Sequence, residues 1–168
     1  MMFCYNVSAI TREEEMPMNK YMRMAVREAE KGIARNDGGP FGAVIVKDGV
    51  VVAKGHNRVV VTHDPTAHGE IVAIRRASKK LGTFDLSGCI LYSTAEPCPM
   101  CLWAIYWANV EKVYYGCTIS DTERIGFRDK EFYELSKRAL QQKMAMVDRD
   151  ECLKLFDQYN AQPGKTNY

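Results

Sequence analysis

Long apolar segments are missing from this sequence of 168 residues. No run approaches the roughly 20 apolar residues that a membrane-spanning helix requires. The first ten residues also contain no lysine or arginine, whereas a secretory signal peptide begins with a basic region. We therefore expect a protein without a membrane partner that works in the cytoplasm.

An excess of charge of one sign is also missing. The chain has 23 basic and 21 acidic residues, a net charge of +2. Such a balance produces no strong field that would attract nucleic acid or an anionic membrane, so a nucleic-acid partner is not expected. Repeats, low-complexity tracts and an interdomain linker are absent too, and the length fits one domain with a hydrophobic core.

Residues 1–16 lack apolar periodicity, and we expect them to form a mobile extension before a single domain over residues 17–168. Periodicity and turn signals predict the order α-β-β-α-β-α-β-α-(β)-α. Helices are expected from residue 17 to the turn at 36–40, and at 64–82, 97–108, 130–140 and 151–159; strands at 43–46, 50–53, 89–93, 113–117 and 144–147. The helix at 97–108 has almost no polar face, which predicts that it is buried. Strands alternating with helices favour an α/β fold with helices on both faces of one mixed sheet.

Cysteine is present six times, but only Cys98 and Cys101 are closely spaced. Without a signal peptide, a close pair is interpreted first as a metal site or a redox pair. A structural zinc site would need a second such pair, and the sequence contains none. Thirty residues before Cys98 stands His68, followed two positions later by Glu70.

Zinc binds thiolate and imidazole ligands in a tetrahedron, and a catalytic site leaves one position open for water. Cys98 and Cys101, three residues apart at a helix start, share a face, and the helix N-terminus favours the thiolate. With His68 they supply three ligands for one zinc per chain, and zinc lowers the pKa of bound water to roughly 7. Glu70 is suited to move protons from the attacking water to the ring and the leaving group, provided that a first-turn geometry brings it to the metal.

The combination of His-x-Glu with a later Pro-Cys-x-x-Cys is the signature of zinc deaminases. At these residues the chain resembles the cytidine and nucleobase deaminase superfamily, and more closely its bacterial guanine deaminases, from about Pro17 to Tyr168. The resemblance is carried by the strings Gly-Gly-Pro-Phe-Gly-Ala-Val-Ile-Val at 38–46, Asp-Pro-Thr-Ala-His at 64–68, Glu-Pro-Cys-Pro-Met-Cys at 96–101 and Ala-Ile-Tyr-Trp-Ala at 104–108. It implies a three-layer αβα cytidine-deaminase-like fold with a mixed central sheet of about five strands.

The resemblance also implies roles for single residues. Asn57 is similar to an asparagine that hydrogen-bonds the purine, and Phe41 and Trp107 to aromatic walls around the base. Asp129 resembles an aspartate that contacts the substrate, and Gly69 retains a main-chain N–H for a substrate contact. From the residues alone, Asn57 could be a turn residue, Phe41 and Trp107 core residues, and Asp129 a solvated charge.

Tyr168 resembles a C-terminal tyrosine that closes the active site of the partner subunit after a domain swap. The resemblance therefore implies a homodimer, whereas the sequence alone predicts a disordered tail at 162–168.

The activity that the resemblance implies is zinc-dependent hydrolysis of guanine to xanthine and ammonia. Gly69 departs from the guanine branch, which usually has alanine there, and His-Gly-Glu also occurs in cytosine-deaminating relatives. Deamination of cytosine or another amino-heterocycle therefore stays open, as does tRNA adenosine deamination on the same fold. A non-catalytic zinc-binding protein is the alternative from another class, and the presence of Glu70 argues against it.

Overall fold

The computed structural model describes residues 19–135 and 144–164, so the expected extension at 1–16 and Tyr168 lie outside the described residues. A four-stranded mixed sheet forms the middle layer, in the order β2-β1-β3-β4. β1 runs antiparallel to both β2 and β3, and β3 runs parallel to β4. The strands are β1 (Gly42–Lys47), β2 (Val50–His56), β3 (Cys89–Ala95) and β4 (Lys112–Cys117).

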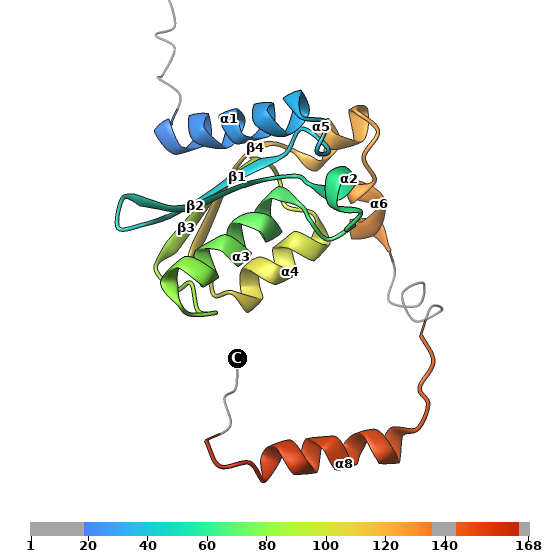
Figure 1. Ribbon diagram of the computed structural model, residues 1–168. Helices are drawn as coiled ribbons and strands as arrows, with labels where there is room; N and C mark the ends of the chain where they lie inside the picture. The colour runs from blue at the N-terminus through green and yellow to red at the C-terminus, as the bar shows by residue number, and fades with distance from the viewer. Residues whose placement is uncertain (1–18, 136–143, 165–168) are drawn as a thin grey trace, which may run out of the picture.

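Helices cover both faces of this sheet. α1 (Lys20–Ala34) packs on one face, while α3 (Gly69–Leu81) and α4 (Pro99–Trp107) pack on the other (Figure 1). Short helices α2 (Val59–Thr62), α5 (Ile119–Arg124) and α6 (Asp129–Glu134) lie near one end of the sheet (Figure 1). The predicted three-layer αβα fold with a mixed sheet is thus confirmed.

The predicted number of about five strands is wrong for the described chain, because residues 144–147 pair with no strand there. Met144, Met146 and Val147 are largely exposed and lead away from the sheet into α8 (Arg149–Asn160) (Figure 1). An apolar run becomes a strand only where it lies along a partner edge, and these residues lie away from the described sheet (Figure 1). The helix expected at 151–159 is confirmed as α8. Of the helix expected at 130–140, only α6 lies in the described residues, and it ends before Leu135.

The position of β1 in the sheet explains why the run at 43–46 contains no polar residue. It is buried on both faces: Ile45 belongs to a core cluster shared with α3 and α4, and Val44 packs beneath α1. Strands covered on both sides are continuously apolar rather than alternating. Glycine permits the close packing, since a Cβ at Gly42 would lie 2.1 Å from the Ala25 carbonyl oxygen of α1.

The burial of α4 differs from what the sequence predicts. Cys101 and Ile105 are buried, but Trp103, Tyr106 and Trp107 are about two-thirds exposed. The helix lies on an outer layer of the domain, so only one side of it can face the sheet. The large apolar residues on its other side are mostly exposed, so the expectation of a buried helix is wrong within the described residues. No helix in the described residues is both long and apolar enough to cross a membrane.

Candidate active site

Two helix N-termini meet beside the same pocket. His68 is the N-cap of α3, and Cys98 is the N-cap of α4 with Pro99 at the first helical position. A close packing holds α3 there, since a Cβ at Gly55 of β2 would lie 2.5 Å from the Gly69 carbonyl oxygen. The parallel step from β3 through α4 to β4 places the Cys98 segment beside α3.

The three predicted metal ligands come together in space. One ligand atom from each of His68, Cys98 and Cys101 lies within 4.8 Å of the others, and Cys98 Sγ is 3.6 Å from His68 Nδ1. An imidazole and two thiols at converging helix N-termini form a donor set that fits zinc. The residues predicted from the sequence as ligands are therefore brought together by the fold.

The electrostatics of this cluster favour an ionised thiol. The hydrogen bond from Cys101, together with the contact to His68, lowers the pKa of Cys98 to about 4. The same contact with Cys98, together with burial, raises the pKa of the Cys101 thiol. The hydrogen bond with Cys98 raises the pKa of His68. A bound divalent cation favours the thiolate form of both cysteines, because metal ligation requires it.

Glu70 lies in the first turn of α3 and is buried beside the ligand cluster. Its carboxylate accepts a hydrogen bond from Ser93 Oγ at 3.2 Å, and Cys101 Sγ donates to Oε2 at 3.5 Å. Burial raises the pKa of this carboxyl group. Because His68 is a non-helical N-cap rather than a helical residue, the two-residue spacing still directs both side chains to one pocket, as the first-turn geometry requires.

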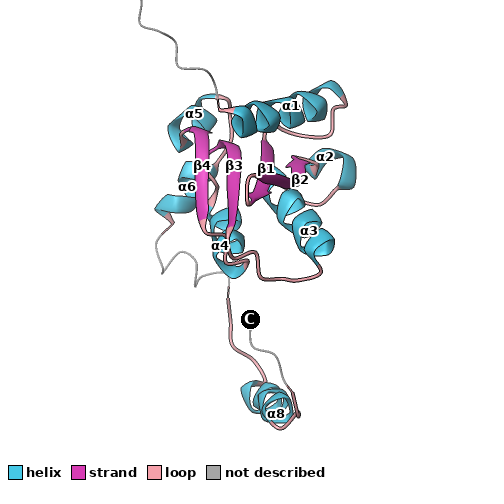
Figure 2. Cartoon of the chain, turned by 90° about the vertical axis from the view of Figure 1, so that its left-hand side faces the viewer, coloured by secondary structure: helices cyan, strands magenta, loops and turns pink. Residues whose placement is uncertain are grey.

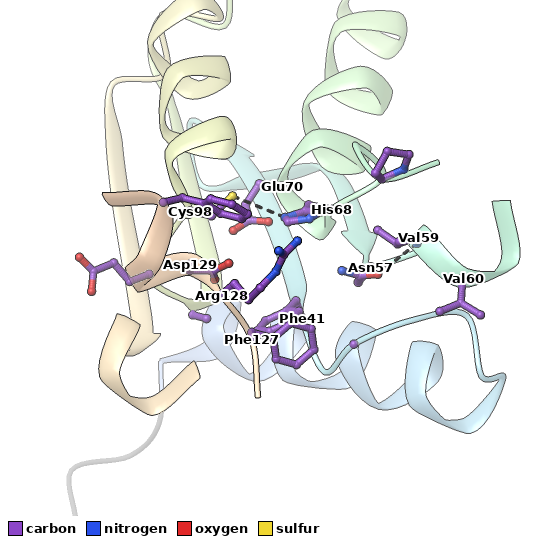
Figure 3. Close-up of a pocket in the computed structure, with 15 residues that line it drawn as sticks. Phe41, Asn57, Val59, Val60, His68, Glu70, Cys98, Phe127, Arg128 and Asp129 are labelled. Carbon is purple, nitrogen blue, oxygen red and sulfur yellow. Dashed lines mark hydrogen bonds between the residues drawn. The ribbon is translucent and has the colours of Figure 1, made fainter. Parts of the chain in front are cut away.

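A cavity of about 350 Å³ opens in front of this cluster, a size suited to a small ligand (Figure 3). The rings of Phe41 and Phe127 meet edge to face on one side, with centroids 4.7 Å apart. Asn57 lies on the side opposite Asp129 (Figure 3). The residues that line the cavity are Gly39, Phe41, Asn57, Val59, Val60, Pro65, His68, Glu70, Ala95, Glu96, Cys98, Phe127, Arg128, Asp129 and Phe132.

Asp129 begins α6 and lies on the metal-ligand side of the cavity. Burial raises the pKa of this carboxyl group, and the negative charge of the nearby Cys98 raises it further. Tyr133, one turn later, donates a 2.7 Å hydrogen bond from its hydroxyl to the Pro97 carbonyl oxygen, which ties α6 to the Cys98 segment. Burial raises the pKa of Tyr133 to about 12.

Phe127, Arg128 and Tyr133 were not among the predicted site residues. Phe127 and Arg128 adjoin Asp129 in sequence, and this adjacency is the one signal that could have found them. Trp107 is not brought to the cavity, because it lies exposed at the end of α4.

Gly69 is the first residue of α3, between the lining residues His68 and Glu70, and it lies against the backbone of Phe41. A Cβ at Gly69 would lie 3.1 Å from the Phe41 carbonyl oxygen, so an alanine fits only if that loop moves by a few tenths of an ångström. The glycine therefore allows a tighter approach between α3 and the residues that precede β1.

Comparison with known proteins places this site in a family. Residues 16–117 match the profile described as the cytidine and deoxycytidylate deaminase zinc-binding region. A guanine deaminase of Bacillus subtilis is 50% identical over 120 residues, which are 71% of this chain and 77% of that protein. A tRNA-specific adenosine deaminase of Aquifex aeolicus is 43% identical over 96 residues, 57% of this chain and 63% of that protein.

Solved structures agree with the sequence comparison. The X-ray structure of guanine deaminase from Bacillus subtilis covers 91% of this chain and 99% of its own, with 41% identity and a TM-score of 0.84. The structure of guanine deaminase from Nitrosomonas europaea covers 84% of each chain, with 33% identity and a TM-score of 0.64. Together with the His68, Cys98 and Cys101 cluster, these similarities show that the chain belongs to the cytidine and deoxycytidylate deaminase family and is a zinc-binding hydrolase that acts on a C–N bond.

Proposed function

We propose that this protein deaminates guanine, converting guanine and water to xanthine and ammonia. One observation carries the choice among deaminase substrates. The likeness to the Bacillus subtilis guanine deaminase structure extends over 91% of this chain. A structure from a study of tRNA:A34 deaminases covers only 58% of this chain, with a TM-score of 0.57. The guanine deaminase likeness therefore extends over much more of this chain than the tRNA deaminase likeness does.

Substrate binding in this proposal uses three sides of the cavity. Phe41 supplies an aromatic face for a flat heterocycle, and Asn57 offers an amide to the edge of the base. Asp129, on the opposite side, accepts a hydrogen bond from a ring N–H or amino group when it is ionised, and the main-chain N–H of Gly69 is a further donor.

The chemistry rests on the ligand cluster and on Glu70. His68, Cys98 and Cys101 would hold one zinc ion, which supplies Lewis acidity that activates a water molecule as the nucleophile. Glu70 accepts a proton at its carboxylate from that water and delivers it to the ring nitrogen beside the reacting carbon. It then moves a second proton to the departing amine, so that ammonia leaves and a carbonyl group remains. Burial raises the pKa of the Glu70 carboxyl group, which favours its protonated form.

The test is a screen of ammonia release with guanine, cytosine, adenine, adenosine and a tRNA anticodon stem-loop. Guanine is expected to give the highest kcat/KM. Faster turnover of the stem-loop or of cytosine would overturn the proposal.

Two alternatives have specific support. The 43% identity to a tRNA-specific adenosine deaminase favours adenosine in tRNA, although the near-neutral net charge offers little attraction for RNA. Gly69 favours cytosine, through the resemblance to cytosine-deaminating relatives. The same screen separates both alternatives from guanine.

We also propose a homodimer in which the C-terminal segment crosses over and Tyr168 of one chain closes the active site of the other. Support comes from α8, which lies apart from the sheet and the helices that cover it (Figures 1 and 2), with Leu155 and Phe156 mostly exposed. Exposed apolar surface of this kind is typical of an interface, and exchange of a terminal element is a low-cost route to a symmetric dimer.

Thiol ligands must stay reduced, which supports our proposal of a cytoplasmic location.

A further inference from the structure

A cluster of ionisable side chains is buried behind the Asn57 side of the cavity without lining it. His56 Nε2 lies 2.8 Å from Asp37 Oδ2, and His56 Nδ1 lies 3.7 Å from Glu28 Oε2. Each of the three residues is less than 10% exposed. Buried ionic groups contribute little net stability compared with apolar residues of the same size, so stability gives a weak reason for this cluster.

Asp37 holds the chain on both sides of Asn57. Its carboxylate pairs with His56, the residue directly before Asn57. Its carbonyl oxygen accepts hydrogen bonds from the main-chain N–H groups of Val60 and Val61, each at 3.1 Å, in the helix that follows Asn57. A single residue in the loop between α1 and β1 thus anchors the end of β2 and the start of α2.

Asn57 is packed so tightly that small shifts of these anchors move its amide. Its main-chain N–H donates to the Phe41 carbonyl oxygen at 2.8 Å, and its Oδ1 accepts from the Val59 N–H at 3.1 Å (Figure 3). A Cβ at Gly38 would lie only 2.1 Å from Oδ1, so the amide rests directly against the residue after Asp37. With Oδ1 engaged by α2, the NH2 group is the part of the amide available to an acceptor on a bound base.

We propose that His56 and Asp37 are positioning residues that set the orientation of the Asn57 amide toward the substrate. Glu28 completes the cluster by placing a carboxylate beside the second ring nitrogen of His56. The inference rests on the proposed function, because it takes Asn57 as the residue that binds the amino-heterocycle. A misplacement of about 1 Å in such a group can cost on the order of 10²-fold in rate.

The kinetic test uses the full-length, zinc-loaded protein. His56→Phe keeps a ring in the space beside Gly32, whose Cβ would lie 2.9 Å from His56 Cδ2, but removes the bond to Asp37. This variant and Asp37→Ala are expected to raise the KM for guanine about tenfold with kcat within about threefold, the pattern of a lost binding contact. Asp37→Asn, whose amide oxygen still accepts from the imidazole, is expected to restore most of the affinity.

A matched control separates positioning from general destabilisation. Leu86 is fully buried in the core cluster and does not line the cavity, so Leu86→Ala should lower the melting temperature without changing KM. Zinc content should remain one per chain in every variant. An unchanged KM in His56→Phe and Asp37→Ala, or the same rise in KM in Leu86→Ala, would overturn the inference.

A second measurement does not depend on the substrate. Hydrogen–deuterium exchange at residues 57–62 should be faster in His56→Phe and Asp37→Ala than in Leu86→Ala, with exchange in β3 unchanged. If guanine proves not to be a substrate while this local increase is seen, the proposed function fails and the positioning role stands. If exchange at 57–62 is unchanged, the positioning role fails even if guanine is turned over.

Discussion

The cavity region and the C-terminal helix α8 differ in which side chains they bury. Around the cavity, polar and ionisable side chains such as Glu70 and Asn57 are buried and hydrogen-bonded. In α8 the large apolar side chains of Leu155 and Phe156 are exposed. The polar groups of the first region find partners among the described residues, whereas the apolar side chains of the second stay exposed there. The proposed dimer would account for this difference, because a partner surface could cover the exposed side of α8.

The largest expected effect is on the chemistry at the cavity. Glu70→Gln should retain one zinc per chain and lose ~10²–10⁴-fold in kcat, because the amide cannot carry the proton. Steady-state kinetics with parallel metal analysis would measure this effect. Glu111→Gln, an exposed change outside the cavity, serves as the control and should keep full activity. A Glu70→Gln enzyme with normal zinc and near-normal rate would remove Glu70 from the mechanism.

Matched truncations of buried and exposed side chains come next. Leu91 is fully buried in the sheet, so Leu91→Ala should lower the free energy of unfolding by about 2–5 kcal/mol. Phe156→Ser should change the stability of the domain by less than about 0.5 kcal/mol and should instead reduce the dimer fraction. Chemical denaturation and light-scattering mass would measure the two effects. A dimer unaffected by Phe156→Ser would show that this side chain of α8 is not part of the interface.

Removal of residues 166–168 tests whether the C-terminal segment serves the cavity. Folding and zinc content should be unchanged, while kcat/KM for guanine falls by about tenfold or more, or ~1.4 kcal/mol of transition-state stabilisation. Replacement of Tyr168 by phenylalanine is the milder variant and separates the ring from the hydroxyl group. Full activity in the truncated protein would exclude a lid at Tyr168 even if the dimer is real.

The smallest expected effect is the contribution of Glu28 to stability and its dependence on pH. Burial acts to raise the pKa of Glu28, but the hydrogen bond and charge of Lys31 outweigh it and hold the pKa below the ordinary value of 4.5. A lowered pKa in the folded state gives stability that is present above about pH 4.5 and is lost as the pH falls through the folded value. Glu28→Gln should therefore be less stable than the parent by about 1 kcal/mol at pH 7, and the gap should close on acidification. A gap that does not change with pH would contradict this account.

The parts of the site that follow local rules could be predicted from the sequence. The combined pattern of His-x-Glu and Pro-Cys-x-x-Cys identifies His68, Glu70, Cys98 and Cys101, although helix starts alone do not predict that segments 30 residues apart converge. Tyr133 could not be found in this way, because its bond to the Pro97 carbonyl oxygen joins segments 36 residues apart.

The errors in the predicted fold have the same cause. Residues 144–147 have the pattern of a strand, but strand formation depends on a partner edge that the local sequence does not encode. α4 has the composition of a buried helix, yet Trp103 and Trp107 are mostly exposed in the described part of the chain, because only one side of the helix faces the sheet. The buried Glu28, Asp37 and His56 are ordinary polar residues in the sequence until the fold brings α1 and β2 together.

The most direct test of the central claim is the appearance of xanthine from guanine, followed by absorbance, with zinc-loaded full-length protein and with protein stripped by a chelator. The expected result is one xanthine and one ammonia per guanine consumed, activity in proportion to bound zinc up to one ion per chain, and recovery when zinc is returned. Guanine left unchanged by fully zinc-loaded protein, or turnover that persists without the metal, would contradict it.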